Sequence, residues 1–353
     1  MSSLSGMKES RYMKNIKSVI AWSIKAIAAG ILAVIVLSGF VYFYRCEGIH
    51  IDNSTGATDY KWEPGQWKAQ MTEGFSWLRM NNEGFNNEID RQDKTDVLIM
   101  GSSHIEACNV AQKENVSSIL NNHYSDLNVY NIGTSGHTIY RCISNLKAAN
   151  ECYKPDKYII IETDRINLDI KSMQEVLDGN DEKLKSYNSG VMYYLQKIPA
   201  IKALYGQIDN WRSAGGKGQA ADTDYTAIDA GNDANADNYD IILNQFIEYA
   251  ADAVKNDSCK LIIFFKPFTS LNPDGSIDYR CNKDDLEHFR SACEKNNIIF
   301  VDMTEDFENA YRNDYIMVHG FTNTAVGTGH LNKYGHKILA ERLIEVIDSL
   351  EED

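Results

Sequence analysis

The longest apolar run in the chain lies close to the N-terminus. Residues 26–44 contain no charged side chain and one polar one, Ser38. Nineteen residues of α-helix rise about 28 Å, which is close to the roughly 30 Å hydrocarbon thickness of a bilayer. Every face of such a helix would be apolar, which argues against a buried core helix. We therefore predict a transmembrane helix over residues 18–44.

The charges around this run predict its orientation. Four basic residues lie in the 1–17 tail, whereas Arg45 is the basic residue that follows the run directly. By the positive-inside rule, the tail is cytoplasmic and residue 46 onward lies outside. A cleaved signal peptide is the alternative, but the run is long for such a peptide and no small-x-small cleavage site follows it. We expect a single-pass protein of the cell membrane whose main domain is extracytoplasmic.

Beyond this run, short apolar segments alternate with amphipathic ones. Five of the apolar segments are nearly continuous, as expected for strands that are covered on both faces. They span residues 96–100, 127–131, 157–162, 260–265 and 298–302. Helices are expected near residues 112–123, 138–152, 241–255, 283–295 and 332–350. This alternation predicts a three-layer α/β/α domain with a central parallel sheet.

Two stretches depart from this pattern. Residues 45–93 precede the first strand, and we expect them to form a stalk or linker whose aromatic side chains pack on the domain. Residues 213–240 are rich in Gly, Ala, Asp and Asn, so they are expected to be a flexible surface insertion. The domain itself is therefore placed at residues 94–353.

The charge and the cysteine spacing of the chain argue against some classes of partner. The chain has 353 residues and a net charge of −15, and its first 45 residues are basic, so the remainder is more acidic still. An acidic body repels polyphosphate, and no nucleic-acid partner is expected. The seven cysteines match no zinc-binding spacing. The pairs Cys142/Cys152 and Cys281/Cys293 are candidates for disulfides, and the sequence leaves their bonding open.

Candidate chemistry follows the predicted strands. Sites in open α/β sheets form at the carboxyl ends of the strands. The first strand ends in GSSH (101–104), the second in NIGTSG (131–136), and GHLNKYGH (329–336) opens the last helix. A serine at a strand-to-helix turn and a histidine before the last helix suit a nucleophile and its general base. Backbone N–H groups at such a turn suit an oxyanion.

These three blocks resemble those of the SGNH (GDSL-like) hydrolase superfamily over about residues 95–350. The resemblance makes Ser103 the nucleophile, with Ser102 in place of the usual Asp. It makes Gly133 a backbone donor to the oxyanion and His330 the general base. It also implies the flavodoxin-like arrangement of the parallel sheet.

Four more residues are candidates for oxyanion or substrate binding beside Gly133. They are Ser102, His104, Asn131 and Asp164. His104 follows the proposed nucleophile. It either contacts the substrate or only lines the cleft. We take His336, six residues after the proposed base, to be structural.

The sequence departs from the family pattern at two points. The family's Asp stands three residues before the His, where this chain has Gly327, and the usual Asn after the third strand is missing. Losing the orienting acid of a triad typically costs about 10⁴-fold in rate. Three explanations stay open. A backbone carbonyl near Gly327 orients His330 in a Ser-His dyad, an acid such as Asp164 substitutes, or the protein is catalytically weak or inactive.

The expected function is that of a serine esterase or O-acetyltransferase acting on acetyl or other acyl esters of cell-surface or exported glycans. Bacterial members of the superfamily with one membrane helix and an outer domain act on acyl groups of cell-surface polymers, some beside a membrane-bound O-acyltransferase. The resemblance thus implies a glycan or a small acylated substrate, with such an acyltransferase as partner. The alternative is an inactive SGNH-like domain that binds a glycan or assists an envelope acylation complex. The sequence carries no metal-ligand spacing, phosphate loop or dinucleotide fingerprint, so we expect no metal and no cofactor.

Overall fold

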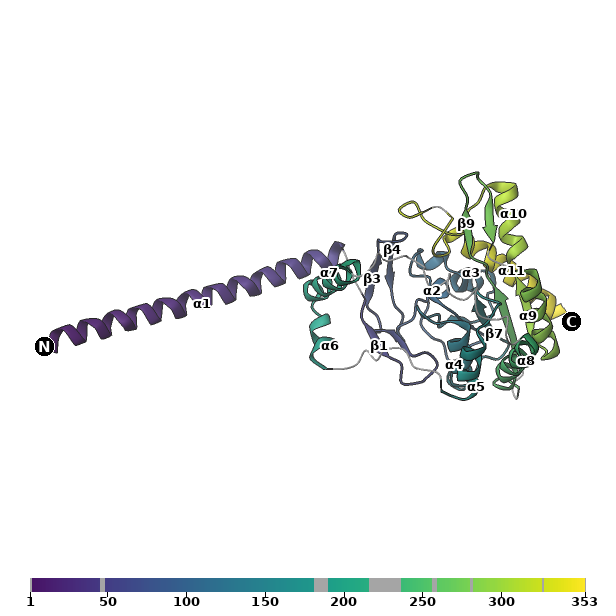
Figure 1. Ribbon diagram of the computed structural model, residues 1–353, viewed down its shortest axis with the longest axis horizontal. Helices are drawn as coiled ribbons and strands as arrows, with labels where there is room; N and C mark the ends of the chain where they lie inside the picture. Colours follow the sequence, from purple (N-terminus) through teal and green to yellow (C-terminus); the bar gives the residue numbers. More distant parts are fainter. Residues whose placement is uncertain are drawn as a thin grey trace. The chain divides into compact units, whose positions relative to one another are not determined.

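The computed structural model describes residues 2–44, 48–180, 190–215, 236–255, 259–279, 282–325 and 327–352. Its internal contacts divide the chain into two compact units. The first comprises Met1–Glu47 and Gly190–Gly218, and the second comprises Gly48–Ser189 and Gln219–Asp353. Figure 1 shows the long helix of the first unit and the layered sheet of the second.

The first unit is built around one long helix. Helix α1 (Ser2–Tyr44) is continuous and includes the predicted 18–44 segment. Its stretch Ile16–Tyr42 is long and apolar enough to cross a membrane, as a signal anchor or a signal peptide would be, and none of it is buried inside the protein. The chain returns to this unit with α6 (Gly190–Gln196) and α7 (Pro199–Gly215), and α7 packs against α1.

The second unit contains the predicted parallel sheet, and the fold class is confirmed. Each of the five predicted strands forms, and neighbouring strands in the sheet are all parallel. They are β5 (Val97–Met100), β6 (Val129–Asn131), β7 (Tyr158–Thr163), β8 (Lys260–Phe265) and β11 (Ile299–Asp302). The spatial order β6-β5-β7-β8-β11 places the first strand of this sheet between the second and the third. This is the flavodoxin-like order, in which the connections reverse direction beside the first strand.

Helices cover both faces of this sheet because alternate strand residues point to opposite sides. Leu98 and Ile159 join the larger core cluster, whereas Val97 and Ile160 join the other. The first face carries α4 (Ile139–Tyr153), α5 (Ile170–Leu177), α8 (Ala236–Asp252) and α9 (Lys283–Lys295). The second face carries α3 (Val116–His123), α10 (Thr304–Asp314) and α11 (Lys333–Glu352).

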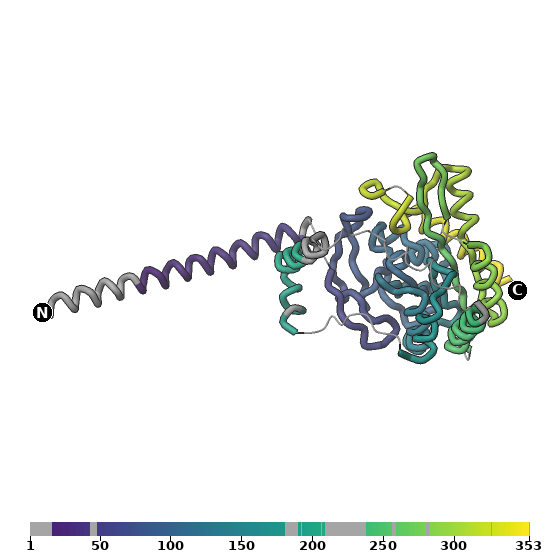
Figure 2. The backbone as a smooth tube through the Cα atoms, viewed as in Figure 1, coloured from purple at the N-terminus to yellow at the C-terminus, as the bar shows by residue number. Residues whose placement is uncertain are grey.

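The segment expected to be a stalk packs into the second unit instead. It forms two hairpins, β1 (His50–Asp52) with β2 (Tyr60–Trp62), and β3 (Trp67–Gln70) with β4 (Ser76–Arg79). Trp62, Leu78 and Met80 are buried in a cluster with Cys108. The backbone trace in Figure 2 shows these N-terminal hairpins against the blue and teal segments of the same unit. Residues 48–93 are therefore part of the folded domain.

The first pair of candidate cysteines is not bonded in the structure. Cys142 and Cys152 are free thiols, because ten residues of one helix place them about 15 Å apart along its axis, too far for a disulfide. Cys293 is a free thiol, and Cys281 lies outside the described residues. Most of the expected insertion, residues 216–235, also lies outside them; α7 and α8 form its two ends.

Candidate functional site

Ser103 occupies the turn that leaves the carboxyl end of β5. It is the first residue of a short helix, α2 (Ser103–Glu106), and Ser102 is the N-cap, whose hydroxyl accepts a hydrogen bond from the N–H of His104. Such a cap satisfies a donor that the first helical turn would otherwise leave unpaired. The sequence after β5 thus fixes the serine at the sheet edge where α/β sites form.

His330 reaches the same place from the other end of the chain. It lies two residues before Asn332, whose side-chain oxygen accepts from the N–H groups of Tyr334 and Gly335 and so fixes the start of α11. The Nε2 atom of His330 lies 2.7 Å from the hydroxyl oxygen of Ser103. The two predicted residues are therefore within hydrogen-bond distance across 227 positions of sequence.

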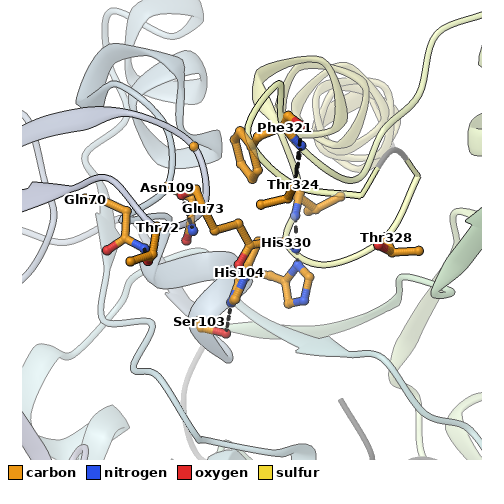
Figure 3. A network of polar contacts seen from close by, with 12 residues as sticks. Gln70, Thr72, Glu73, Ser103, His104, Asn109, Phe321, Thr324, Thr328 and His330 are labelled. Atoms are coloured by element: carbon orange, nitrogen blue, oxygen red, sulfur yellow. Dashed lines mark hydrogen bonds and ion pairs between the residues drawn. The ribbon is translucent and has the colours of Figure 1, made fainter. Parts of the chain in front are cut away.

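A third residue, Glu73, completes the constellation, and the sequence reading missed it. One carboxylate oxygen lies 2.5 Å from Nδ1 of His330, and the other accepts the His330 backbone N–H at 2.6 Å. Figure 3 shows Glu73, His330 and Ser103 converging from three different segments. A serine, a histidine and a carboxylate linked in this order form the geometry of an acyl-transfer triad.

The turn between β3 and β4 carries Glu73, and neighbouring side chains hold that turn. The side-chain amide of Asn109 donates to the Glu73 carbonyl at 2.9 Å. Asn323 accepts from the N–H of Gly74 at 3.0 Å and donates to two carbonyls of the same turn. Gly329 has φ +84°, and a side chain there would collide with the Glu73 carboxylate. Glycine is needed at this position, since both the conformation and the close approach exclude a Cβ.

Electrostatics keep this carboxyl ionised. Burial alone would raise the pKa of Glu73, but the hydrogen bonds and the charge of the His330 ring outweigh it, so the pKa is lowered. An ionised Glu73 requires the proton on Nδ1 of His330, which leaves Nε2 to accept a proton from Ser103. The side chains of Glu73 and His330 remain partly exposed, so a small molecule can reach them from solvent.

Of the explanations for the missing acid, the structure contains the second, an acid from elsewhere in the chain, but that acid is Glu73 and not Asp164. The carbonyl of Gly327 accepts a hydrogen bond from the hydroxyl of Thr269 at 2.9 Å. Asp164 faces the guanidinium of its neighbour Arg165 at 3.8 Å. The position beside Nδ1 of His330 belongs to Glu73, which precedes the histidine by 257 residues.

Ser102 is hydrogen-bonded to Glu162, which forms a buried ion pair with Lys266. Its N–H and its hydroxyl both donate to one oxygen of Glu162 at 2.7 Å. The other oxygen of Glu162 lies 3.8 Å from the ammonium of Lys266, which is fully buried and lies 4.3 Å from the ring centroid of Phe268. Burial raises the pKa of Glu162, while the Lys266 charge and the bonds from Ser102 oppose that rise. A Cβ on Gly101 would lie 2.6 Å from the same carboxylate, so a residue larger than glycine would collide with it.

The turn after β6 has a packing role in the structure. The Gly133 N–H, assigned above to the oxyanion, donates to the side chain of Asn131 at 2.7 Å. The amide of Asn131 in turn donates to the carbonyl of Ile105 at 2.6 Å. A Cβ on Gly133 would meet the backbone of Ile105 and Glu106 at about 2.6 Å. Both residues therefore hold α2 against the sheet, and the expected oxyanion amide is already engaged.

His104 packs behind the triad histidine. Its ring centroid lies 4.8 Å from that of His330, and its Nδ1 accepts the N–H of Leu331 at 3.1 Å. Burial lowers the pKa of His104 well below its usual value, and the nearby positive charge of Lys266 lowers it further. The same two causes act on His319 and His336, and they lower the pKa of His336 to about 3. These buried imidazoles therefore stay neutral around the site.

Several solved structures resemble this chain at low sequence identity. No family model and no curated protein matches the chain. A member of the lipolytic protein G-D-S-L family from Veillonella parvula is 12% identical, with 71% of this chain and 96% of that chain covered and a TM-score of 0.38. An alpha/beta hydrolase enzyme from the metagenome of Lake Arreo, Spain, is 15% identical over 71% and 94%, with a TM-score of 0.38. The acetyl xylan esterase AlAXEase is 15% identical over 71% and 99%, with a TM-score of 0.39. The structural neighbours thus include G-D-S-L lipolytic hydrolases at low identity.

A cavity of about 580 Å³ opens next to the turn that carries Glu73. Its wall includes Gly74, Phe75, His319 and Asn332. Asn332 lies two residues after His330, and His319 forms a β-bridge with Leu331, the residue next to His330. Aromatic rings and a few polar groups contribute to the lining, among them Tyr315, Phe321, Lys333 and Tyr334. Its size is within the range of small-molecule sites. In the part of the chain that the structure describes, His, Cys, Asp and Glu form no cluster suited to a metal ion.

Proposed function

We propose that this chain is a serine-dependent acyl esterase or O-acetyltransferase that acts on acyl esters of cell-surface or exported glycans. One observation carries the proposal. The hydroxyl of Ser103, the imidazole of His330 and the carboxylate of Glu73 form an unbroken hydrogen-bonded series, with distances of 2.7 Å and 2.5 Å. This geometry favours a complete triad over the inactive domain considered from the sequence.

The reaction proceeds through an acyl-serine. Ser103 attacks the ester carbonyl while Nε2 of His330 takes the hydroxyl proton. The tetrahedral intermediate then expels the alcohol, which receives that proton from His330, and the acyl group remains on the serine. Water or a sugar hydroxyl next gives a proton to Nε2 and attacks the acyl-serine. The Ser103 oxygen then leaves and takes that proton from His330, which releases the free acid or the new ester and restores Ser103. Glu73 orients the ring and stabilises the imidazolium at each step.

The Ser103 N–H is the backbone donor proposed for the oxyanion. It stands at the first position of α2, where a helix has no internal acceptor for its amide. The neighbouring amides are engaged, since those of Ser102 and His104 donate to Glu162 and to the Ser102 hydroxyl. Preorganised donors of this kind typically contribute 10²–10³-fold in rate.

Two features support a glycan as substrate. The apolar helix α1 suits anchoring at the cell surface, where such polymers occur. The cavity beside Glu73 presents the exposed rings of Phe75, Tyr315 and Tyr334 next to polar side chains, and aromatic faces with a polar rim suit the mixed surface of a sugar.

The test uses the full chain in detergent with an aryl acetate and with an acetylated polysaccharide. We expect Ser103→Ala to abolish turnover of both substrates and labelling by a fluorophosphonate. Ser276→Ala, which alters an exposed serine in a turn, is the matched control and should behave like the wild type. Adding an acceptor oligosaccharide separates transfer from hydrolysis by the mass of the product. Equal turnover by Ser103→Ala would exclude the proposed nucleophile, and a wild-type chain that resists the label would favour the binding role instead.

A further inference from the structure

The first unit contains a contact that links a later part of the chain to the apolar helix. The N–H of Ala200, in the first turn of α7, donates to the hydroxyl of Ser38 at 3.4 Å, and α7 lies beside the C-terminal turns of α1 (Figure 1). Ser38 stands four residues before the end of the apolar stretch Ile16–Tyr42. Four helical residues rise about 6 Å, so this contact lies near one end of the apolar stretch.

Next to this contact, several apolar side chains of the described residues are exposed. On α6, Val191 is 73% exposed and Tyr194 is 70% exposed; on α7, Leu204 is 62% exposed. Ile208, one turn beyond Leu204, is also exposed and lies on the same helical face. Exposing this many apolar side chains of a short helix pair to water is unfavourable.

We propose that α6 and α7 lie in the outer boundary of the lipid bilayer, where they form a second membrane attachment. The occupant of their exposed face is lipid, because the apolar stretch of α1 that they adjoin is itself unburied and suited to lipid on all sides. Tyr193 and Tyr194 are neighbours on α6, and the Lys197 ammonium lies 4.8 Å from the ring centroid of Tyr193. Tyrosine and lysine side chains are typical of the headgroup region. The proposal rests on α1 spanning the membrane.

This attachment changes how the catalytic unit is tethered. The chain passes between the two units three times, at residues 47–48, 189–190 and 218–219. A cut after α1 would therefore leave two connections from the catalytic unit to α6 and α7. We infer that the catalytic unit stays at the membrane even when α1 is cut away from it.

Lipid labelling tests the location. The full chain is placed in phosphatidylcholine vesicles that contain a phospholipid with a photoactivatable acyl chain, and labelled peptides are identified by mass spectrometry. We expect label on α1 and on residues 190–215. Phe75 and Tyr315, which are 75% and 80% exposed in the other unit, are controls that should stay unlabelled. Label on α1 without label on 190–215 would overturn the inference, whereas an unlabelled α1 would contradict the anchor itself.

Cleavage tests the tether. A site for a sequence-specific protease replaces residues 45–47, and the membranes are washed with concentrated salt after cleavage. We expect residues 48–353 to remain bound, and the variant Val191→Ser/Leu204→Ser/Ile208→Ser to be released with its aryl-acetate activity unchanged. Ser38→Ala should remain bound after cleavage, because lipid and not α1 holds the helix pair. Release of the parent chain, or release of Ser38→Ala but not of the triple variant, would overturn the inference.

Discussion

At the scale of single residues, the site depends on an acid that comes from far away in sequence. Glu73 contacts both the ring and the backbone of a histidine 257 residues later. A local acid would orient His330 through its own loop, whereas this one does so through the turn between β3 and β4. Orientation of His330, the proposed general base, therefore requires the N-terminal hairpins to be folded into the same unit.

Replacing this acid tests its role. We predict that Glu73→Gln lowers kcat for an aryl acetate by roughly 10⁴-fold, because an amide favours the wrong tautomer of His330 and cannot stabilise the imidazolium. The measurement is steady-state kinetics on the full chain. Glu88→Gln, an exposed acid in the same N-terminal segment, is the control and should leave kcat unchanged. A loss of less than tenfold in Glu73→Gln would mean that another group orients the base.

The ion pair beneath Ser102 allows positioning to be separated from stability. Removing Glu162 alone leaves a buried lysine charge without this partner, which typically costs about 3–5 kcal/mol. We predict that Glu162→Leu/Lys266→Met retains near-parent stability, since both charges are removed together. Its kcat should still fall roughly 10²-fold with little change in KM, because Ser102 loses the acceptor for its N–H and its hydroxyl. Thermal unfolding and steady-state kinetics measure the two effects. A double variant with full activity would show that the pair does not position the nucleophile turn.

At the scale of elements, the sequence pattern predicted the strands of the parallel sheet, whose residues are mostly buried. The five sheet strands are mostly apolar because helices cover both faces, and this pattern can be recognised without tertiary information. The hairpins before residue 94 have strands of three or four residues with polar side chains between them, so their sequence resembles a linker. The packing of this segment is decided by contacts distant in sequence. For example, the Asn87 side chain donates to the Asn131 carbonyl and accepts from the Asn131 N–H.

The same dependence on distant contacts explains which site residues could be predicted. Ser103 and His330 could be found because each lies next to a strand or a helix with a clear pattern. Glu73 has no local signal, since its partner is fixed only when the hairpin packs against α2 and the loop before α11. Gly133 was assigned to the oxyanion from its motif, but the motif alone does not show which acceptor its N–H meets. The neighbouring Asn131 side chain is that acceptor.

The end of α10 offers a test of the cavity. Tyr315 caps this helix with φ 55°, a conformation that costs a non-glycine residue about 1–2 kcal/mol, and its side chain is exposed beside the cavity. We predict that Tyr315→Gly raises the free energy of unfolding by about 1 kcal/mol while KM for an acetylated glycan rises. Denaturant titration and kinetics with both substrates measure this. An aryl acetate, which is too small to span the cavity, should be turned over as before. A glycan KM that does not change would remove Tyr315 from the proposed binding surface.

At the scale of the whole molecule, the buried histidines make stability depend on pH, and three of them, His104, His319 and His336, lie around the site. Their pKa values are lowered in the folded state by burial and by the charge of Lys266, and that of His336 falls to about 3, from an ordinary value of 6.5. Between these values the unfolded chain binds protons that the native chain does not, so the free energy of unfolding falls as pH decreases below 6.5. Each such histidine contributes up to about 1.4 kcal/mol per pH unit.

His336→Phe keeps an aromatic ring in the core, and Nδ1 of His336 has no hydrogen-bond partner among the described residues. We therefore predict that this variant reduces the slope between pH 6 and pH 4 by about 1.4 kcal/mol per pH unit, as measured by urea titrations at fixed pH. An unchanged slope would mean that the native protein admits a proton at His336, and that the imidazoles around the triad are not held neutral by burial.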